Sequence, residues 1–97
     1  MLLKRLTEAC GGPGQEDEVR NLIRGEVKDL VDQVTTDALG NLITVKNGTK
    51  AGPKVMIAAH MDEVALMIMS IEKSGLLKFN PIGGIDPRVL VAKTVVV

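Results

Sequence analysis

The sequence predicts an α/β protein in which a helical first third precedes a strand-rich remainder. Apolar residues recur at helical spacing as far as about residue 30. Beyond that point, short runs of β-branched residues alternate with clusters of glycine, proline and asparagine, which is the pattern of strands joined by turns. The continuous apolar run Val55–Ala59 is typical of a central strand that is covered on both faces.

Two helices are expected in the first third of the chain. The first covers residues 2–9, where leucines and an alanine share one face. Glycines and a proline within residues 10–14 must end it, because they cannot continue a helix. The second helix begins near Gln15 and has acidic residues in its first turn, where the helix dipole favours negative charge. Its apolar stripe consists of Val19, Leu22, Ile23, Val27 and Leu30.

A hairpin and a central strand are expected next. Residues 34–36 and 42–45 have the composition of two paired strands. The turn between them contains Gly40 and Asn41, which are both able to adopt positive φ. Residues 54–59 then form the central strand.

The last third is expected to be made of strands and turns. Residues 64–71 and 76–79 form a pair of strands around the Ser74–Gly75 turn. Residues 80–87 are rich in turn formers and read as a loop, and residues 89–97 read as a final strand. An apolar strand at the end of a chain is an exposed edge. We therefore expect the chain to be truncated, or this strand to pair with another polypeptide.

Composition narrows the class of protein. Ninety-seven residues make one small domain or a piece of a larger one, with a limited core. The net charge is zero, which removes the basic surface of a nucleic-acid-binding protein. The single cysteine, Cys10, permits no intrachain disulfide and fits a reducing compartment. No apolar run is long enough to cross a membrane, so we expect a cytoplasmic protein without a membrane partner.

The only histidine of the chain, His60, directly follows the apolar run, and Asp62 lies two residues further on. Residues two apart in an extended segment point to the same side. Ligands of open α/β sheets bind at the carboxyl ends of strands, which is where these two residues stand. His60 is therefore a candidate metal ligand. Asp62 is either a second ligand or the carboxylate that holds the imidazole ring.

A structural interpretation of the same residues is also open. His60 would then lie at the end of a core strand, with Asp62 and Glu63 solvated in the following loop. A pattern as short as His-x-Asp has many chance matches. In addition, one histidine cannot complete a multi-histidine site, so most ligands of any metal would have to come from elsewhere.

The segment Ala58–Glu63 resembles the M42 family of metallo-aminopeptidases, which comprises glutamyl and deblocking aminopeptidases, some of them labelled endoglucanase. Several other motifs resemble the family in the same order, and together they are much more specific than any one of them. These segments are Leu2–Thr7, Gly14–Arg20, Thr36–Ile43 and Pro81–Leu90.

The resemblance implies the N-terminal part of a zinc-exopeptidase-type α/β sandwich. Residues 1–70 would belong to this catalytic domain, and residues 71–97 would start an inserted small β domain related to PDZ modules. His60 aligns with a histidine ligand to one of two divalent metal ions, zinc or cobalt. Asp62 aligns with the catalytic-site aspartate that orients this histidine.

The resemblance also implies a peptide substrate and a homo-oligomer, commonly a dodecamer in the family. The remaining ligands and the glutamate general base lie downstream in family members and are not in this chain. We therefore expect this chain to supply one ligand and to be inactive alone.

Two alternatives remain open. One is a non-catalytic module that pairs with a partner through a sheet edge, and the other is a related di-zinc amidohydrolase. The sequence does not reveal the preferred N-terminal residue or the identity of the metal.

Overall fold

The computed structural model describes residues 1–97 and divides into two compact units, Met1–Asp62 and Glu63–Val97. It contains two α-helices, four β-strands and one short 3₁₀ helix. The expected mixture of helices and strands is confirmed. The expected domain boundary at residue 70 stays a prediction, because the two units describe packing within these 97 residues.

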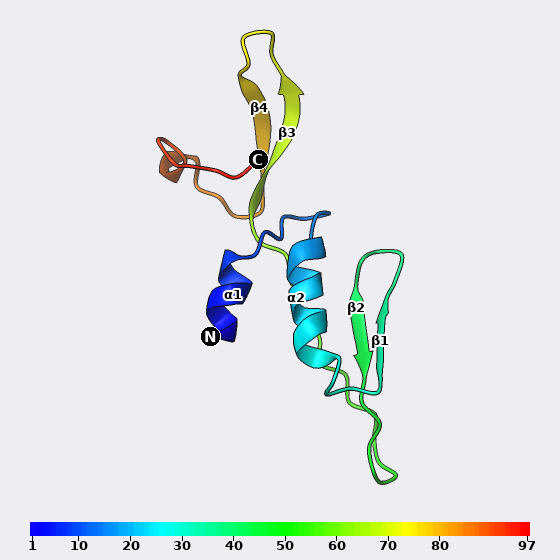
Figure 1. Ribbon diagram of the computed structural model, residues 1–97. Helices are drawn as coiled ribbons and strands as arrows, with labels where there is room; N and C mark the ends of the chain where they lie inside the picture. Colours follow the sequence, from blue (N-terminus) through cyan, green and yellow to red (C-terminus); the bar gives the residue numbers. More distant parts are fainter. The chain divides into compact units, whose positions relative to one another are not determined.

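The first unit begins with the two expected helices, α1 (Leu2–Glu8) and α2 (Asp17–Val27), which lie beside each other in Figure 1. The glycine-rich run separates them as predicted. Helix α2 is shorter than its apolar pattern indicated, because the chain turns after Val27 and leaves Leu30 exposed. Val19 is the buried residue of α2.

Strands β1 (Gln33–Thr36) and β2 (Leu42–Val45) form the expected antiparallel hairpin, with Thr36 opposite Leu42. The turn depends on Gly40, which has a φ of +87°. A residue with a Cβ rarely adopts this conformation. Asn41, which is also able to adopt positive φ, does not do so here.

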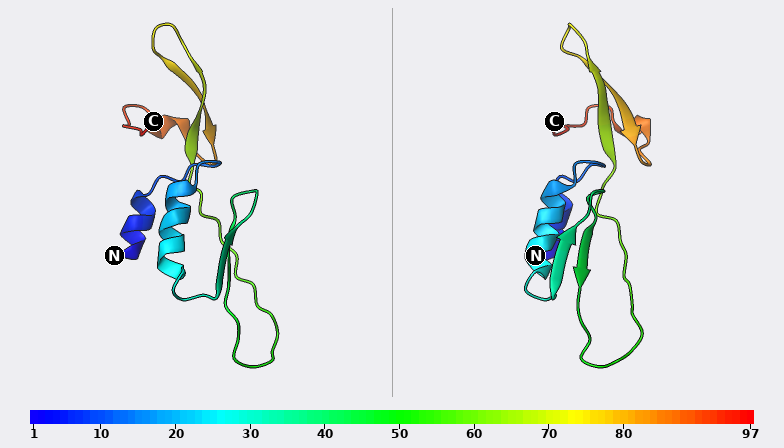
Figure 2. Two further views of the ribbon diagram at one scale, coloured as in Figure 1. Left: turned by 45° about the vertical axis from the view of Figure 1, so that its right-hand side comes forward. Right: turned by 90° about the vertical axis from the view of Figure 1, so that its right-hand side faces the viewer.

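The central strand expected at residues 54–59 does not form. A β-strand exists only through hydrogen bonds to a neighbour, and no strand of this chain pairs with the segment. Val55, Met56 and Ile57 are 82%, 88% and 93% exposed as a result. Figure 2 shows the segment, in light green, as an extended stretch that is not part of a strand.

The second unit is built around strands β3 (Ala65–Ile71) and β4 (Leu77–Ile82), which pair antiparallel as expected. Strand β4 runs further than its composition indicated, because Pro81 and Ile82 continue the pairing with Leu66 and Ala65. A proline is tolerated in this position because β4 is an edge strand.

The final strand expected at residues 89–97 is also wrong. The 3₁₀ helix η1 (Pro87–Val89) occupies the start of this region, and the residues after it are not in a strand. The physical reason is again the missing partner, since no other strand extends the β3–β4 pair.

The hydrophobic core is small. Ala9 and Val19 are the buried apolar residues of the whole chain, while many larger apolar side chains are exposed. Neither helix combines the length and apolar character needed to span a bilayer.

Candidate functional site

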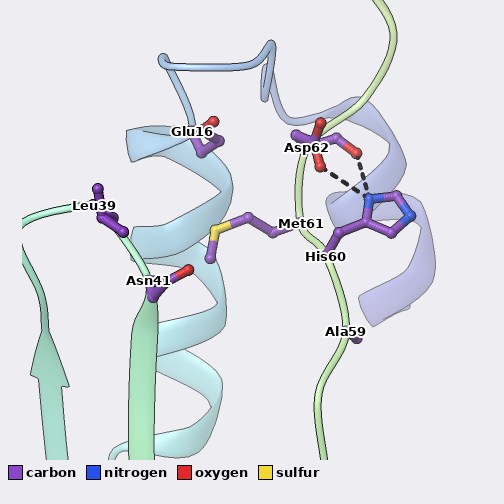
Figure 3. A pocket seen from close by; sticks show the side chains of 8 residues that line it. Glu16, Leu39, Asn41, Ala59, His60, Met61 and Asp62 are labelled. Carbon is purple, nitrogen blue, oxygen red and sulfur yellow. Dashed lines mark hydrogen bonds and ion pairs between the residues drawn. The ribbon is translucent and has the colours of Figure 1, made fainter. Parts of the chain in front are cut away.

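His60, Met61 and Asp62 lie at the end of the first unit, just after the unpaired segment. Their side chains alternate, as expected for extended backbone. Figure 3 shows His60 and Asp62 on one side of the chain and Met61 on the other, pointing toward Asn41 and α2. The structure therefore brings together the two residues that the sequence singled out.

The ring of His60 is held by Asp62 through a single nitrogen. His60 Nδ1 lies 3.0 Å from Asp62 Oδ1 and 3.0 Å from the Asp62 carbonyl oxygen. Both oxygens are acceptors, so Nδ1 must carry the hydrogen and donate it. In the neutral ring, this arrangement leaves the lone pair on Nε2. The His60 side chain is 85% exposed, so Nε2 is accessible.

A cavity of about 140 Å³ adjoins this pair of residues. Its walls come from three parts of the first unit: Glu16 at the start of α2, the hairpin turn Leu39–Asn41 and the segment Ala59–Asp62. Glu16 and Asn41 lie on the side of the segment to which Met61 points, while the ring of His60 lies on the other side (Figure 3).

A second cavity, of about 200 Å³, lies on the apolar side of the same segment. Ile23 and Val27 of α2, Leu42 and Thr44 of β2, and the segment Ala59–Met61 line it. Met61 thus borders both cavities, the polar one and the apolar one.

Arg20 connects two walls of the polar cavity. Its Nε donates to the carbonyl oxygen of Gly40 over 2.7 Å, and its Nη2 lies 3.3 Å from Glu16 Oε2. Its Nη1 also donates to Asp17 Oδ1. The Arg20 side chain is only 11% exposed, so it is surrounded by these partners rather than by water.

The hairpin turn has its own internal hydrogen bonds. Asp37 Oδ1 accepts from the backbone amides of Leu39 and Asn41, over 3.0 and 2.9 Å. Asn41 Nδ2 donates to Asp37 Oδ2 over 2.8 Å. The bond from the Asn41 side chain, followed by those from the backbone, lowers the pKa of Asp37.

The chemistry of His60 and Asp62 fits one corner of a metal site. An imidazole whose second nitrogen is held by a carboxylate is the usual form of a histidine ligand. A neutral imidazole nitrogen suits zinc or cobalt. No group of three or more histidine, cysteine, aspartate or glutamate side chains gathers in the structure. The chain thus offers a metal ion a single oriented ligand atom, Nε2 of His60.

The sequence alone did not reveal that Glu16, Arg20 and Asn41 surround the site. Glu16 and Arg20 have i,i+4 spacing on a helix, which signals an ion pair but no connection to His60. Gly40 signals a turn without indicating which side chain approaches it. These contacts depend on tertiary structure.

Comparisons with known proteins show which family this chain is similar to. The M42 glutamyl aminopeptidase family profile matches residues 40–97. The lysyl aminopeptidase of Pyrococcus furiosus is 42% identical over 95 residues, which is 97% of this chain and 27% of the relative.

Solved structures are also similar to this chain. An aminopeptidase from the archaeon Desulfurococcus kamchatkensis superposes with a TM-score of 0.85 and 43% identity, over 92% of this chain and 25% of that one. A structure titled endoglucanase, from Thermotoga maritima, has a TM-score of 0.83 and 45% identity, over 91% of this chain and 28% of that one. The chain spans about a quarter of the length of these relatives.

Proposed function

Because the chain belongs to the M42 glutamyl aminopeptidase family, we propose that it supplies the His60–Asp62 corner of a two-metal aminopeptidase site. The observation that carries this proposal is the hydrogen bond between His60 Nδ1 and Asp62 Oδ1, which leaves an accessible Nε2.

In this proposal, His60 binds one metal ion through Nε2. Asp62 accepts the hydrogen of Nδ1, which fixes both the tautomer and the direction of the ring. A carboxylate in this position also makes an imidazole a better electron donor to a metal ion. When bound, the metal ions would polarise the scissile carbonyl and activate water.

The other ligands and the general base would come from parts of the family chain outside these 97 residues. Zinc in catalytic sites needs three protein ligands, and this chain gathers no such group. The relatives are about four times as long, which leaves room for those residues. The 97-residue chain would accordingly be inactive by itself.

We further propose peptides as the substrates and the cytoplasm as the location. The relatives named aminopeptidases support a peptide substrate. Residues 1–70 would then belong to the catalytic domain and residues 71–97 to the start of an inserted β domain related to PDZ modules. Strand β4, at residues 77–82, supports β structure in that part of the chain. Assembly into a homo-oligomer is part of the same proposal.

A substrate panel tests the proposed activity. The full-length protein, meaning the natural polypeptide that carries these residues, would be given aminoacyl anilides with free and acetylated amines. The panel would also include amides without a free amine, as substrates for an amidohydrolase. A β-glucan is added because one similar structure bears the name endoglucanase. We expect cleavage of free-amine substrates that a chelator abolishes. Cleavage of the glucan or of blocked amides instead would contradict the proposal.

The same panel tests the inactivity of the short chain. The 97-residue chain should show no cleavage of any substrate. Chelator-sensitive peptidase activity from this chain would show that its metal site is more complete than we propose.

A further inference from the structure

Met61 is the residue at which the unpaired segment docks onto the rest of the first unit. Every side chain from Ile43 to His60 is exposed, and Met61 is the first that is half-buried. Its backbone also comes close to the glycine-rich loop, because a Cβ built on Gly11 would lie 3.4 Å from the Met61 carbonyl oxygen. The contacts of Met61 therefore fix the orientation of this segment on the first unit.

The place that receives the Met61 side chain lies between α2 and the hairpin turn. In Figure 3 the side chain extends from its segment toward Asn41, with Glu16 on the same side. Glu16 and the turn Leu39–Asn41 both line the polar cavity that Met61 borders. We call this place the Met61 seat, and define it by Glu16, Gly40 and Asn41.

Arg20 holds the two halves of the Met61 seat together. Its Nε donates to the carbonyl oxygen of Gly40 in the turn, and the adjacent Nη2 interacts with Glu16 at the start of α2. These contacts link residues twenty positions apart and involve a side chain that is nearly buried. Hydrogen bonds to charged groups that are shielded from water are stronger than exposed ones.

Gly40 leaves room for this contact. A Cβ at Gly40 would lie 2.9 Å from Arg20 Nη2, so any side chain there would push the guanidinium away. The turn thus approaches Arg20 more closely than any residue other than glycine would allow.

We propose that Arg20 is a positioning residue for the His60–Asp62 pair, acting through the Met61 seat. Side chains alternate in an extended segment, so seating Met61 on one side directs His60 and Asp62 to the other. The proposal rests on the proposed function for its catalytic consequence. Arg20 touches neither His60 nor Asp62, so its effect must be transmitted by Met61.

The test compares variants of the full-length protein. In Arg20→Ala, we expect kcat to fall about 10- to 100-fold while KM changes less than about threefold, because small displacements of a reacting group are that costly. Backbone amides of residues 59–62 should also exchange hydrogen faster, which reports on the segment without requiring activity.

Arg24→Ala is the matched control. Arg24 lies one turn further along α2 and donates to Thr36 Oγ1 of β1, so it also joins the helix to the hairpin. It lines neither cavity. Its kcat and its hydrogen exchange at residues 59–62 should stay within about twofold of the parent protein, because it contributes nothing to the Met61 seat. An equal loss in Arg24→Ala would overturn the proposal, because a general loss of stability would then explain both.

A double variant tests the route through Met61. Arg20→Ala and Met61→Ala should each lower kcat, and the double variant should be no worse than the poorer single variant, because both remove the same contact. Additive losses would overturn the route, and so would an Arg20→Ala protein that behaves like the parent.

Two further outcomes are decisive. If Arg20→Ala does not fold, Arg20→Lys replaces it, since lysine retains a charged donor but loses the planar fork, and kcat should then fall to a value between that of the parent and the 10- to 100-fold loss expected for the alanine variant. An Arg20→Lys protein with unchanged kcat and exchange would overturn the proposal.

If the parent shows no peptidase activity, the proposed function fails, and hydrogen exchange alone decides the role of Arg20.

Discussion

At the residue scale, several aspartates of this chain serve as acceptors for nearby amides and guanidinium groups. Asp32 accepts from the Asn47 amide, and Asp86 accepts from Arg88, which lowers the pKa of both carboxyl groups. Asp37 does the same within the hairpin turn that lines the site. These side chains shape loops locally, and Asp62 uses the same property to hold the ring of His60.

The pKa of Asp37 gives a pH-dependent prediction. Folding lowers it below 3.8, so the stabilisation from Asp37 is fully present above that pH and is lost as pH falls through the folded value. Asp37→Ala removes this contribution. We expect urea unfolding of the full-length variant to differ from the parent at pH 7 and to differ less at pH 3. Asp29→Ala, at an exposed carboxylate, is the control. A difference that is the same at both pH values would contradict this role.

Asp62 allows a sharper test of the site. Asp62→Asn keeps the size of the side chain but removes its charge, so Nδ1 of His60 loses its carboxylate partner. We expect metal affinity or activity of the full-length protein to fall about 10- to 100-fold, the usual effect of losing such a partner. Zinc titration and peptidase assays would measure it, with Asp29→Asn as the control. Unchanged affinity and activity would mean that Asp62 does not orient the ring.

Residue-level prediction from sequence succeeded where the geometry is local. His60 and Asp62 were expected on the same side because they are two positions apart in extended backbone, and the structure brings them to hydrogen-bonding distance. The contact between Arg20 and Gly40 was not predicted, because it joins a helix to a turn that lies twenty residues away.

At the element scale, the elements that formed as expected are those with local partners. The helices depend on hydrogen bonds within themselves, and the β1–β2 and β3–β4 hairpins pair across short turns. The strands expected at residues 54–59 and 89–97 require a distant neighbour. No strand of these 97 residues provides one, so the same apolar pattern yields an unpaired segment.

The hairpin turn gives a prediction at this scale. Gly40→Ala places a methyl group at a φ of +87° and 2.9 Å from Arg20 Nη2. Gly75→Ala is the matched control, because Gly75, in the turn between β3 and β4, also has positive φ but open space around it. Conformational strain alone should cost about 1–2 kcal/mol in each variant.

Gly40→Ala should destabilise the full-length protein more than Gly75→Ala, since Arg20 must also give up its hydrogen bond to the turn. It should in addition lower kcat in the manner of Arg20→Ala. Thermal unfolding and peptidase kinetics would measure the two effects. Equal behaviour of the two alanine variants would show that the approach of Arg20 to the turn is unimportant.

At the scale of the whole molecule, the chain exposes far more surface than a compact protein of its mass. Its accessible surface is 8421 Å² at 10.4 kDa. A folded monomer of this mass is expected to expose about 5,400 Å². Many large apolar side chains are exposed, including the run Val55–Ile57. Surface of this kind normally marks an interface.

This surface leads to a prediction for the short chain. By itself, the 97-residue chain should unfold without a cooperative transition, because two buried apolar residues cannot offset the entropy of ordering the backbone. Circular dichroism during urea titration would measure this, with sedimentation to detect self-association. A sharp transition of a monomer would show that the chain is stable without a partner and would favour an independent module.

The central claim is that His60 binds one of two metal ions in the full-length protein. The most direct measurement is metal content after zinc loading and dialysis, for the parent and for His60→Ala. We predict two ions per chain in the parent, fewer in His60→Ala, and no peptidase activity in the variant. A His60→Ala protein that retains the same metal content and activity would contradict the claim.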